Sequence, residues 1–78
     1  MARFTVYEYK RDGLYRPFDD TLLFKAETSN LTDAVNIIIK RHPQAELVTK
    51  GKPLGLHYYS IMKTENGHEH ENLGFYKL

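Results

Sequence analysis

The sequence contains no cysteine among its 78 residues. This absence excludes disulfide bonds, zinc sites built on thiolates, and thiol nucleophiles. A secreted domain of this size usually depends on disulfides, so we expect the protein to act in the cytoplasm. Long apolar runs are lacking too, since the isoleucines Ile37–Ile39 stand between Asn36 and Lys40. The N-terminus lacks the layout of a signal peptide, and we expect no membrane partner.

A surplus of either charge is also missing. Eleven Lys and Arg residues stand against ten Asp and Glu residues, giving a formal net charge of +1. This balance argues against a histone-like coat on DNA and against an acidic mimic of DNA. Hydrophobic residues make up 41% and aromatic residues 13% of the chain, which is too much for a disordered segment. We therefore expect one compact domain spanning residues 1–78.

Catalytic motifs are absent from the sequence. Ser29 and Ser60 are the only serines, and neither lies in a Gly-x-Ser-x-Gly elbow. There is no phosphate-cradling glycine-rich loop and no His-Glu-x-x-His motif. Asp19 and Asp20 are adjacent in a loop, where paired acids more often cap or turn the chain than catalyse. The sequence predicts a protein that is not an enzyme and binds no cofactor.

The segment His68-Glu69-His70-Glu71 could be either a metal site or a polar hairpin tip. Alternate residues of a strand share a face, so His68 and His70 could share a divalent ion with His57 as a third ligand. The expected strand pairing places His57 too far along the hairpin to join them. We therefore interpret this segment as a polar hairpin tip and expect no bound metal.

The remaining pattern predicts strands around one helix. Residues 3–11 and 21–27 alternate apolar and polar types and form an expected hairpin, with a connecting loop at 12–20. Residues 45–49 are a short candidate strand, and residues 56–64 are a strong one.

The helix has clear signals at both ends. Asn30 can cap it, with Asp33 near the start, and Pro43 follows its end. Basic residues Lys40 and Arg41 suit the last turn, where the helix dipole favours positive charge. The spacing predicts a buried face made of Leu31, Ala34, Val35, Ile38 and His42.

Asn66 and Gly67 form the strongest hairpin signal, because both can adopt the positive φ of a type I′ turn. Counting outward pairs Glu65 with His68, Lys63 with His70, Ser60 with Leu73, and Tyr58 with Phe75. The expected core face then contains Leu56, Tyr58, Met62, Leu73 and Phe75. The expected outer face contains His57, Tyr59, Ile61, Lys63, His70 and Tyr76. A slip by one residue would exchange the two faces.

Together these elements predict an α+β fold. One helix packs on a largely antiparallel sheet of four or five strands in the order ββαββ(β), and a β-grasp arrangement has this order and nearly this length.

Aromatic residues occur in both alternation phases of the strands, although one helix covers one sheet face. Some tyrosines must therefore face outward, and exposed tyrosines are typical of protein interfaces. Ordinary strand propensity is the plain alternative. The expected contact residues are the tyrosines Tyr7, Tyr9, Tyr59 and Tyr76, with Arg11 and Arg16 as polar anchors.

Two other readings of that face stay open. Tyrosines near Lys25, Lys63 and Lys77 could stack bases of single-stranded nucleic acid, although Glu8 and Glu27 lie on the same strands. An open sheet face could also join two copies, so the protein is expected to be a monomer or a homodimer.

Residues 24–48 contain a strand that ends in Ala26-Glu27-Thr28, a helix with the pattern Leu-x-x-Ala, a break and a second strand. This unit resembles small single-domain phage proteins, namely the podovirus inhibitor of host RNA polymerase and the anti-CRISPR proteins. The resemblance implies a non-enzymatic protein that occludes a site on a bacterial enzyme or nucleoprotein complex, in the cytoplasm of the host. It transfers no functional residue, because the matching positions are structural.

Overall fold

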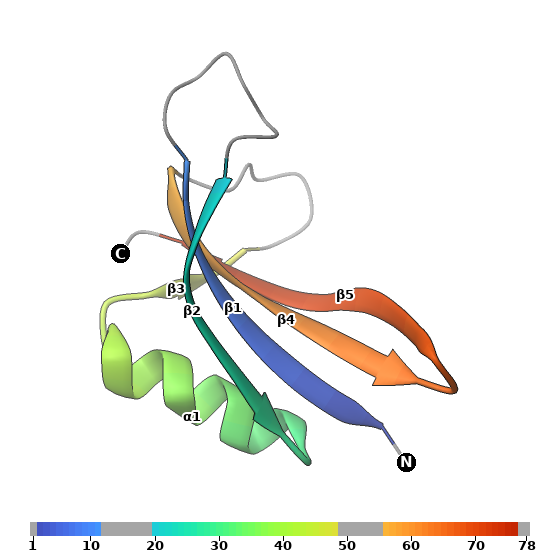
Figure 1. Cartoon of the computed structure of the whole chain (residues 1–78). Helices are drawn as coiled ribbons and strands as arrows, with labels where there is room; N and C mark the ends of the chain where they lie inside the picture. Colours follow the sequence, from blue (N-terminus) through green and yellow to red (C-terminus); the bar gives the residue numbers. More distant parts are fainter. Residues whose placement is uncertain (1, 12–19, 49–55, 77–78) are drawn as a thin grey trace.

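A computed structural model describes residues 2–11, 20–48 and 56–76 of the chain. The elements, in chain order, are β1 (Arg3–Arg11), β2 (Asp20–Thr28), α1 (Leu31–Arg41), β3 (Glu46–Leu47), β4 (His57–Glu65) and β5 (His68–Tyr76). The strands form one five-stranded sheet in the order β2-β1-β4-β5-β3, and every pairing is antiparallel. α1 packs along one side of the sheet (Figure 1). The predicted α+β class is confirmed, with one helix on a largely antiparallel sheet.

α1 forms where its capping signals predicted it. The side chain of Asn30 accepts a hydrogen bond from the backbone N–H of Asp33 at 2.8 Å and donates its amide to the Asp33 carboxylate at 3.0 Å. These bonds satisfy one of the free N–H groups at the helix start. At the other end the backbone N–H of His42 donates to the carbonyl of Ile38 at 2.8 Å. The helix therefore holds Arg41 and His42 at a fixed place above the sheet.

The hydrophobic core lies between α1 and the sheet. Its fully or nearly fully buried members come from three strands and the helix, and they are Val6, Ala34, Ile38, Tyr59, Ile61 and Phe75. Phe4, Phe24, Leu31, Val35, Ile37, Ala45 and Leu73 pack against them. Apolar burial of this kind is the main favourable contribution to folding in a small domain.

The β4–β5 hairpin has the predicted turn, but its register differs beyond the tip. Asn66 and Gly67 have φ angles of 54° and 80°, and the pairs Glu65–His68 and Lys63–His70 are confirmed. A bulge between Ile61 and Met62 then shifts the pairing by one residue. The predicted pairs Ser60–Leu73 and Tyr58–Phe75 are therefore wrong.

The bulge decides which side chains of β4 reach the core. Tyr59 pairs with Phe75 and Ile61 pairs with Leu73, so all four face α1. Met62 pairs with Glu71, which leaves Asn72 as the extra residue of β5. Tyr58 is buried as expected, but on the sheet side opposite α1, whereas the expected core position of Met62 and the expected outward positions of Tyr59 and Ile61 are wrong. The physical reason is that one inserted residue exchanges the faces of a strand.

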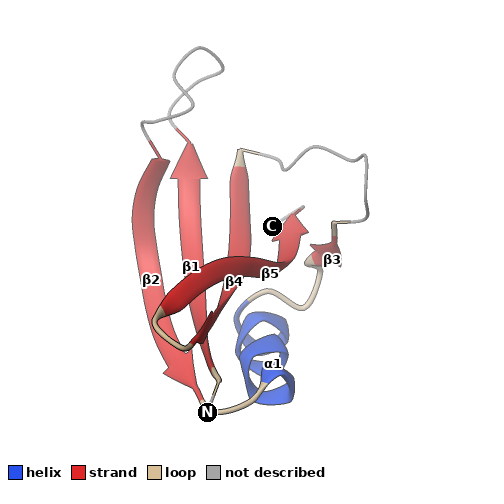
Figure 2. Cartoon of the chain, turned by 90° about the vertical axis from the view of Figure 1, so that its right-hand side faces the viewer, coloured by secondary structure: helices blue, strands red, loops and turns tan. Residues whose placement is uncertain are grey.

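The β4–β5 hairpin curls over the sheet face that α1 leaves uncovered. In Figure 2, β5 passes in front of β4 and β1. The hydroxyl of Tyr7 on β1 donates to Glu69 at 3.4 Å, and the hydroxyl of Ser60 donates to Glu71 at 3.4 Å. Thr5, Tyr58 and Ser60 are buried on this side of the sheet. In the described part of the chain, no helix has the length and apolar character needed to cross a bilayer.

Candidate functional site

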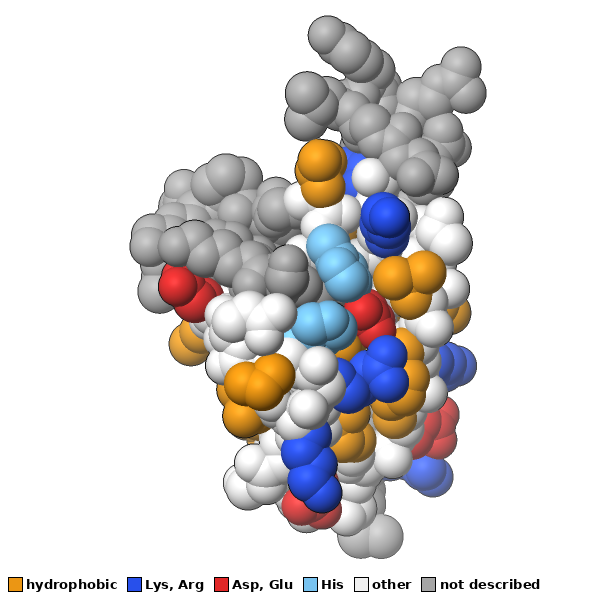
Figure 3. All heavy atoms as spheres, turned by 90° about the vertical axis from the view of Figure 1, so that its left-hand side faces the viewer, with side chains coloured by type: hydrophobic (Ala, Val, Ile, Leu, Met, Phe, Trp, Pro, Cys, Tyr) orange, Lys and Arg blue, Asp and Glu red, His pale blue; other side chains and the backbone are white. Residues whose placement is uncertain are grey.

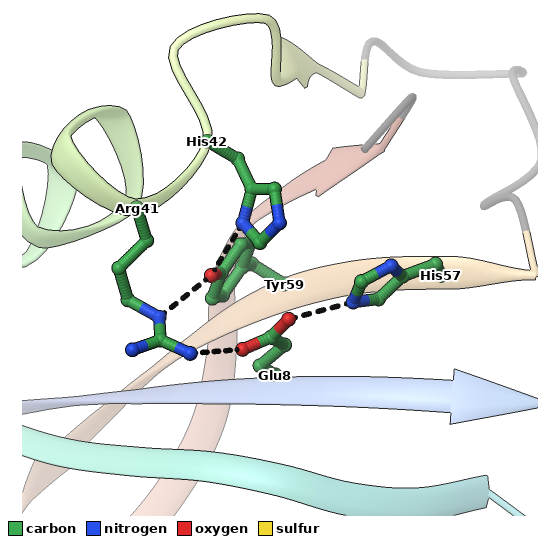
Figure 4. A network of polar contacts seen from close by, with 5 residues as sticks. All are labelled: Glu8, Arg41, His42, His57 and Tyr59. Atoms are coloured by element: carbon green, nitrogen blue, oxygen red, sulfur yellow. Dashed lines mark hydrogen bonds and ion pairs between the residues drawn. The ribbon is translucent and has the colours of Figure 1, made fainter.

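A cluster of polar side chains lies where the end of α1 meets β1 and the start of β4. Its members are Glu8, Arg41, His42, His57 and Tyr59 (Figure 4). Glu8 lies on the α1 side of β1 and is only 3% exposed. A buried charge without partners is strongly unfavourable, so the surroundings of this carboxylate govern the whole cluster.

Both oxygens of Glu8 have charged or polar partners. Arg41 donates from Nη2 to Oε1 at 2.8 Å, and the Nε2 atom of His57 lies 2.6 Å from Oε2. The strand register explains the second contact, because Glu8 pairs with Tyr59 and the neighbouring pair of the same phase is Lys10–His57. The two strands therefore bring an acid and an imidazole together across a sequence separation of 49 residues.

The hydroxyl of Tyr59 joins the helix end to this acid. It accepts a hydrogen bond from Nε of Arg41 at 2.9 Å and lies 2.8 Å from Nδ1 of His42. The guanidinium of Arg41 also lies over the ring of Phe24, at 3.8 Å from its centroid. Arg41 is thus held by an acid, a hydroxyl and an aromatic ring, which fixes its planar fork in one orientation.

The cluster shifts the protonation of its members. Burial raises the pKa of Glu8, but the hydrogen bonds from Arg41 and His57 outweigh burial and leave the pKa of this carboxyl below its ordinary value. Burial raises the pKa of the Tyr59 hydroxyl, and the nearby Glu8 carboxylate raises it further. The hydrogen bond to Glu8 also raises the pKa of Arg41. Glu8 is therefore a carboxylate and Tyr59 a neutral phenol around neutral pH.

This cluster was not predicted from the sequence. The predicted position of His42 on the buried face of the helix agrees with its contact with Tyr59, whereas the predicted position of His57 on the outer face is wrong, because its ring contacts Glu8 on the α1 side. Glu8 lies on the same face of β1 as Phe4 and Val6, and a charged residue on that apolar face was the available signal. Its partners come from distant elements, so no local spacing could indicate them.

The side of the sheet opposite α1 carries the second group of candidate residues. Tyr7 and Tyr9 lie there with their rings stacked, the centroids 5.9 Å apart and the planes 19° apart. The ring centroids of Tyr58 and Tyr9 are 5.4 Å apart, and the guanidinium of Arg11 lies 5.7 Å from the centroid of the Tyr58 ring. Lys25 on β2 places its ammonium 5.6 Å from the Tyr7 centroid. We call Tyr7, Tyr9, Arg11 and Lys25 the tyrosine surface, and Tyr58 is buried beside them.

Of the other predicted contact residues, Tyr59 is the one whose side chain the structure describes, and it does not join the tyrosine surface. Tyr59 is fully buried on the opposite side of the sheet, so its prediction as an outward contact residue is wrong. Its hydroxyl is used inside the polar cluster, and its ring fills the core. Arg16 and the side chain of Tyr76 lie outside the described residues.

His68 and His70 are exposed on β5 next to the turn. His57, at the other end of β4, contacts Glu8 instead. The structure therefore separates His57 from the two hairpin histidines, as the expected pairing required.

Comparisons with known proteins supply no family for this chain. No family model matches it, and neither the curated proteins nor the solved structures contain a significant match.

Proposed function

We propose that this chain is a non-enzymatic protein-binding module that uses the tyrosine surface. The observation that carries the proposal is the stacked pair Tyr7–Tyr9, partly exposed on the sheet side that α1 leaves uncovered. Stacking and neighbouring cations fix these rings before any partner arrives, so their ordering costs little on binding. Rigid aromatic side chains with polar tips are typical of interface hot spots.

Apolar surface next to the tyrosines supports the same use. Leu22 pairs with Tyr9 across β1 and β2, so the two side chains share a face. Leu22 is 48% exposed, and Leu23, the extra residue of a bulge in β2, is 49% exposed. A patch of leucine and tyrosine bordered by Lys25 and Arg11 combines an apolar centre with a charged rim, which is the usual composition of a binding surface.

Nucleic acid is the weaker candidate for this surface. A base-stacking platform needs free ring faces, whereas Tyr7 and Tyr9 turn their faces toward each other and present edges and hydroxyls. Glu69 contacts the Tyr7 hydroxyl, and Glu27 on β2 is exposed nearby. Carboxylates at these places repel a phosphate backbone.

The finer form of the proposal follows the resemblance of residues 24–48. The module would be a phage or mobile-element inhibitor that acts in the bacterial cytoplasm and occludes a site on RNA polymerase, a CRISPR effector or another enzyme or nucleoprotein complex. A β-grasp-like arrangement of the strands and helix belongs to the same proposal. Support for this form is the combination of a small rigid domain, an aromatic surface and a strand–helix–strand unit of the expected type.

The test is affinity capture from nuclease-treated bacterial lysate, followed by binding to purified RNA polymerase and a purified CRISPR effector. We compare the wild type with the double variant Tyr7→Ala/Tyr9→Ala, using circular dichroism to verify folding. The matched control is Ile39→Ala, which removes an exposed apolar side chain on α1. We expect a stoichiometric protein partner whose affinity falls at least ~10-fold in the double variant and is unchanged in the control.

Three outcomes would contradict the proposal. Equal capture by the double variant would place the interface elsewhere. Recovery that disappears with nuclease would assign the tyrosine surface to nucleic acid. Capture of the chain's own copies alone, with a doubled solution mass, would show a homodimer.

A further inference from the structure

We propose that Glu8, His42 and His57 form a binding site for a divalent transition-metal ion of the Zn²⁺ class. Each residue offers a ligand atom, and the three atoms lie within 4.8 Å of one another. This site lies on the α1 side of the sheet and is independent of the tyrosine surface.

The donor set indicates the class of ion. Two imidazoles and one carboxylate form a set that zinc uses where a fourth position stays open to water or another ligand. Imidazole nitrogen also suits copper, nickel and iron, whereas Ca²⁺ and Mg²⁺ require a shell made of oxygen atoms. The three residues supply one nitrogen from each of two imidazole rings and one oxygen from a single carboxylate. The site therefore favours a transition metal over the alkaline-earth cations.

The three ligand atoms must shift by up to about 1.5 Å relative to one another to receive the ion. Tetrahedral zinc with ligands at 2.0–2.1 Å separates two ligand atoms by about 3.3 Å. Nε2 of His57 and Oε2 of Glu8 are 2.6 Å apart, so they must separate by about 0.7 Å. His57 can move in this way because its side chain is 31% exposed. An ion between these atoms replaces the proton on Nε2, and the neutral ring then carries its proton on Nδ1.

His42 is the third ligand, and it comes from the end of α1. Its ring lies 5.4 Å from the ring of His57 at an angle of 80°. Nδ1 of His42 is 2.8 Å from the hydroxyl of Tyr59, and Figure 4 shows the second nitrogen of this ring on the side toward His57. When Nδ1–H donates to the tyrosine oxygen, Nε2 is the free nitrogen of His42. A hydrogen bond on the second nitrogen is how most ligating histidines are oriented.

Arg41 supports the site from outside it. It donates to Oε1 of Glu8 and leaves Oε2 to face the histidines. It also donates to the hydroxyl of Tyr59 that orients His42. The arginine keeps the carboxylate ionised and fixes its plane, although its positive charge limits the affinity for the cation.

The ligands are accessible from solvent. His42 and His57 are both partly exposed, while Glu8 closes the inner side. In Figure 3, two histidine side chains lie close together on the described surface with an acidic side chain beside them. An ion can therefore enter from this face and keep a water molecule or a partner's side chain at its open position.

The experiment is isothermal titration of the full chain, without a polyhistidine tag, with Zn²⁺ and separately with Mg²⁺ at pH 7.5. We expect one Zn²⁺ per chain and no saturable binding of Mg²⁺. His57→Ala, which removes a partly exposed side chain, is expected to weaken Zn²⁺ binding at least ~10-fold. The matched control is His70→Ala at the exposed hairpin, which is expected to bind as the wild type does.

Co²⁺ gives a second readout that a structural role would not affect. A tetrahedral site produces an intense visible spectrum, and this spectrum is expected in the wild type and in His70→Ala but not in His57→Ala. Absence of stoichiometric Zn²⁺ binding would overturn the proposal. Loss of binding in His70→Ala together with full binding in His57→Ala would also overturn it, because the metal would then belong to the hairpin histidines.

Discussion

Glu8 carries its charge inside the protein because its neighbours supply hydrogen bonds that water would otherwise provide. Arg41 and His57 bind one carboxylate oxygen each, and their contacts set the pKa below the ordinary value in spite of burial. Removing one partner from such a group leaves a buried charge without compensation. Glu8 therefore stabilises the fold while its partners are present, and it destabilises the fold when one of them is removed.

A pH titration of stability tests this description. A carboxyl whose folded pKa is lower than its unfolded pKa contributes stability above the unfolded value, about 4.3, and loses that contribution as the pH falls through the folded value. We expect the free energy of unfolding of the wild type to fall relative to that of Glu8→Gln as the pH drops below about 5. Urea unfolding at a series of pH values measures the difference. Glu65→Gln, at the exposed turn, controls for the loss of a carboxyl group, and parallel curves for the wild type and Glu8→Gln would contradict the prediction.

At the residue scale, alternation predicted which side chains share a face but not which face is outward. Tyr7 and Tyr9 were predicted to lie opposite Phe4 and Val6, and the alternation in β1 did not indicate which of these faces α1 covers. Tyr58 and Tyr59 are adjacent and identical in type, so composition cannot tell which of them faces the core. The extra residue Asn72 on β5 decides it, and bulges have no sequence signal comparable to a turn dipeptide.

Among the elements, α1 was the most predictable because each of its signals is local. The cap at Asn30 and the helical spacing of its apolar residues need no information from elsewhere in the chain. The polar cluster was unpredictable for the opposite reason. The cluster depends on the pairing of β1 with β4, which are far apart in the sequence. The residue pattern within a strand does not indicate which strand will lie beside it.

Two neighbouring isoleucines on α1 give the sharpest test of the helix–sheet contact. Ile38 is fully buried, whereas Ile39 is 41% exposed. We expect Ile38→Ala to lower the free energy of unfolding by about 2–5 kcal/mol, through lost burial and the cavity left behind. Ile39→Ala is expected to cost less than about 1 kcal/mol, since most of its surface change occurs in water. Chemical denaturation measures both, and equal effects would show that the assigned helix face is wrong.

For the molecule as a whole, the core depends on strands from both ends of the chain. Val6 comes from the first strand, Ala34 and Ile38 come from the helix, and Tyr59, Ile61 and Phe75 come from β4 and β5. A hairpin with one short helix cannot bury enough apolar area to offset the entropy of ordering the chain. The domain is therefore expected to fold as one cooperative unit.

Truncation tests this cooperativity. A chain that ends at Val48 keeps β1, β2 and α1 but lacks the three core side chains of β4 and β5. We expect it to show no cooperative thermal transition and little helical circular dichroism at 25 °C. The full chain is the control, and a sigmoidal transition in the truncated chain would show that the first half forms its own core.

The bulge between β1 and β2 has a consequence for the behaviour of the protein at high concentration. β2 is an outer strand of nine residues, and its row of backbone groups on the free side is a template on which a second chain could add a strand. Leu23 is the extra residue at the bulge, opposite the step from Glu8 to Tyr9. It interrupts the regular spacing of those groups midway along the edge, and exposed Lys25 and Glu27 follow it. An irregular outer strand is a poor template for fibril-like stacking of copies, so we expect this edge to disfavour aggregation.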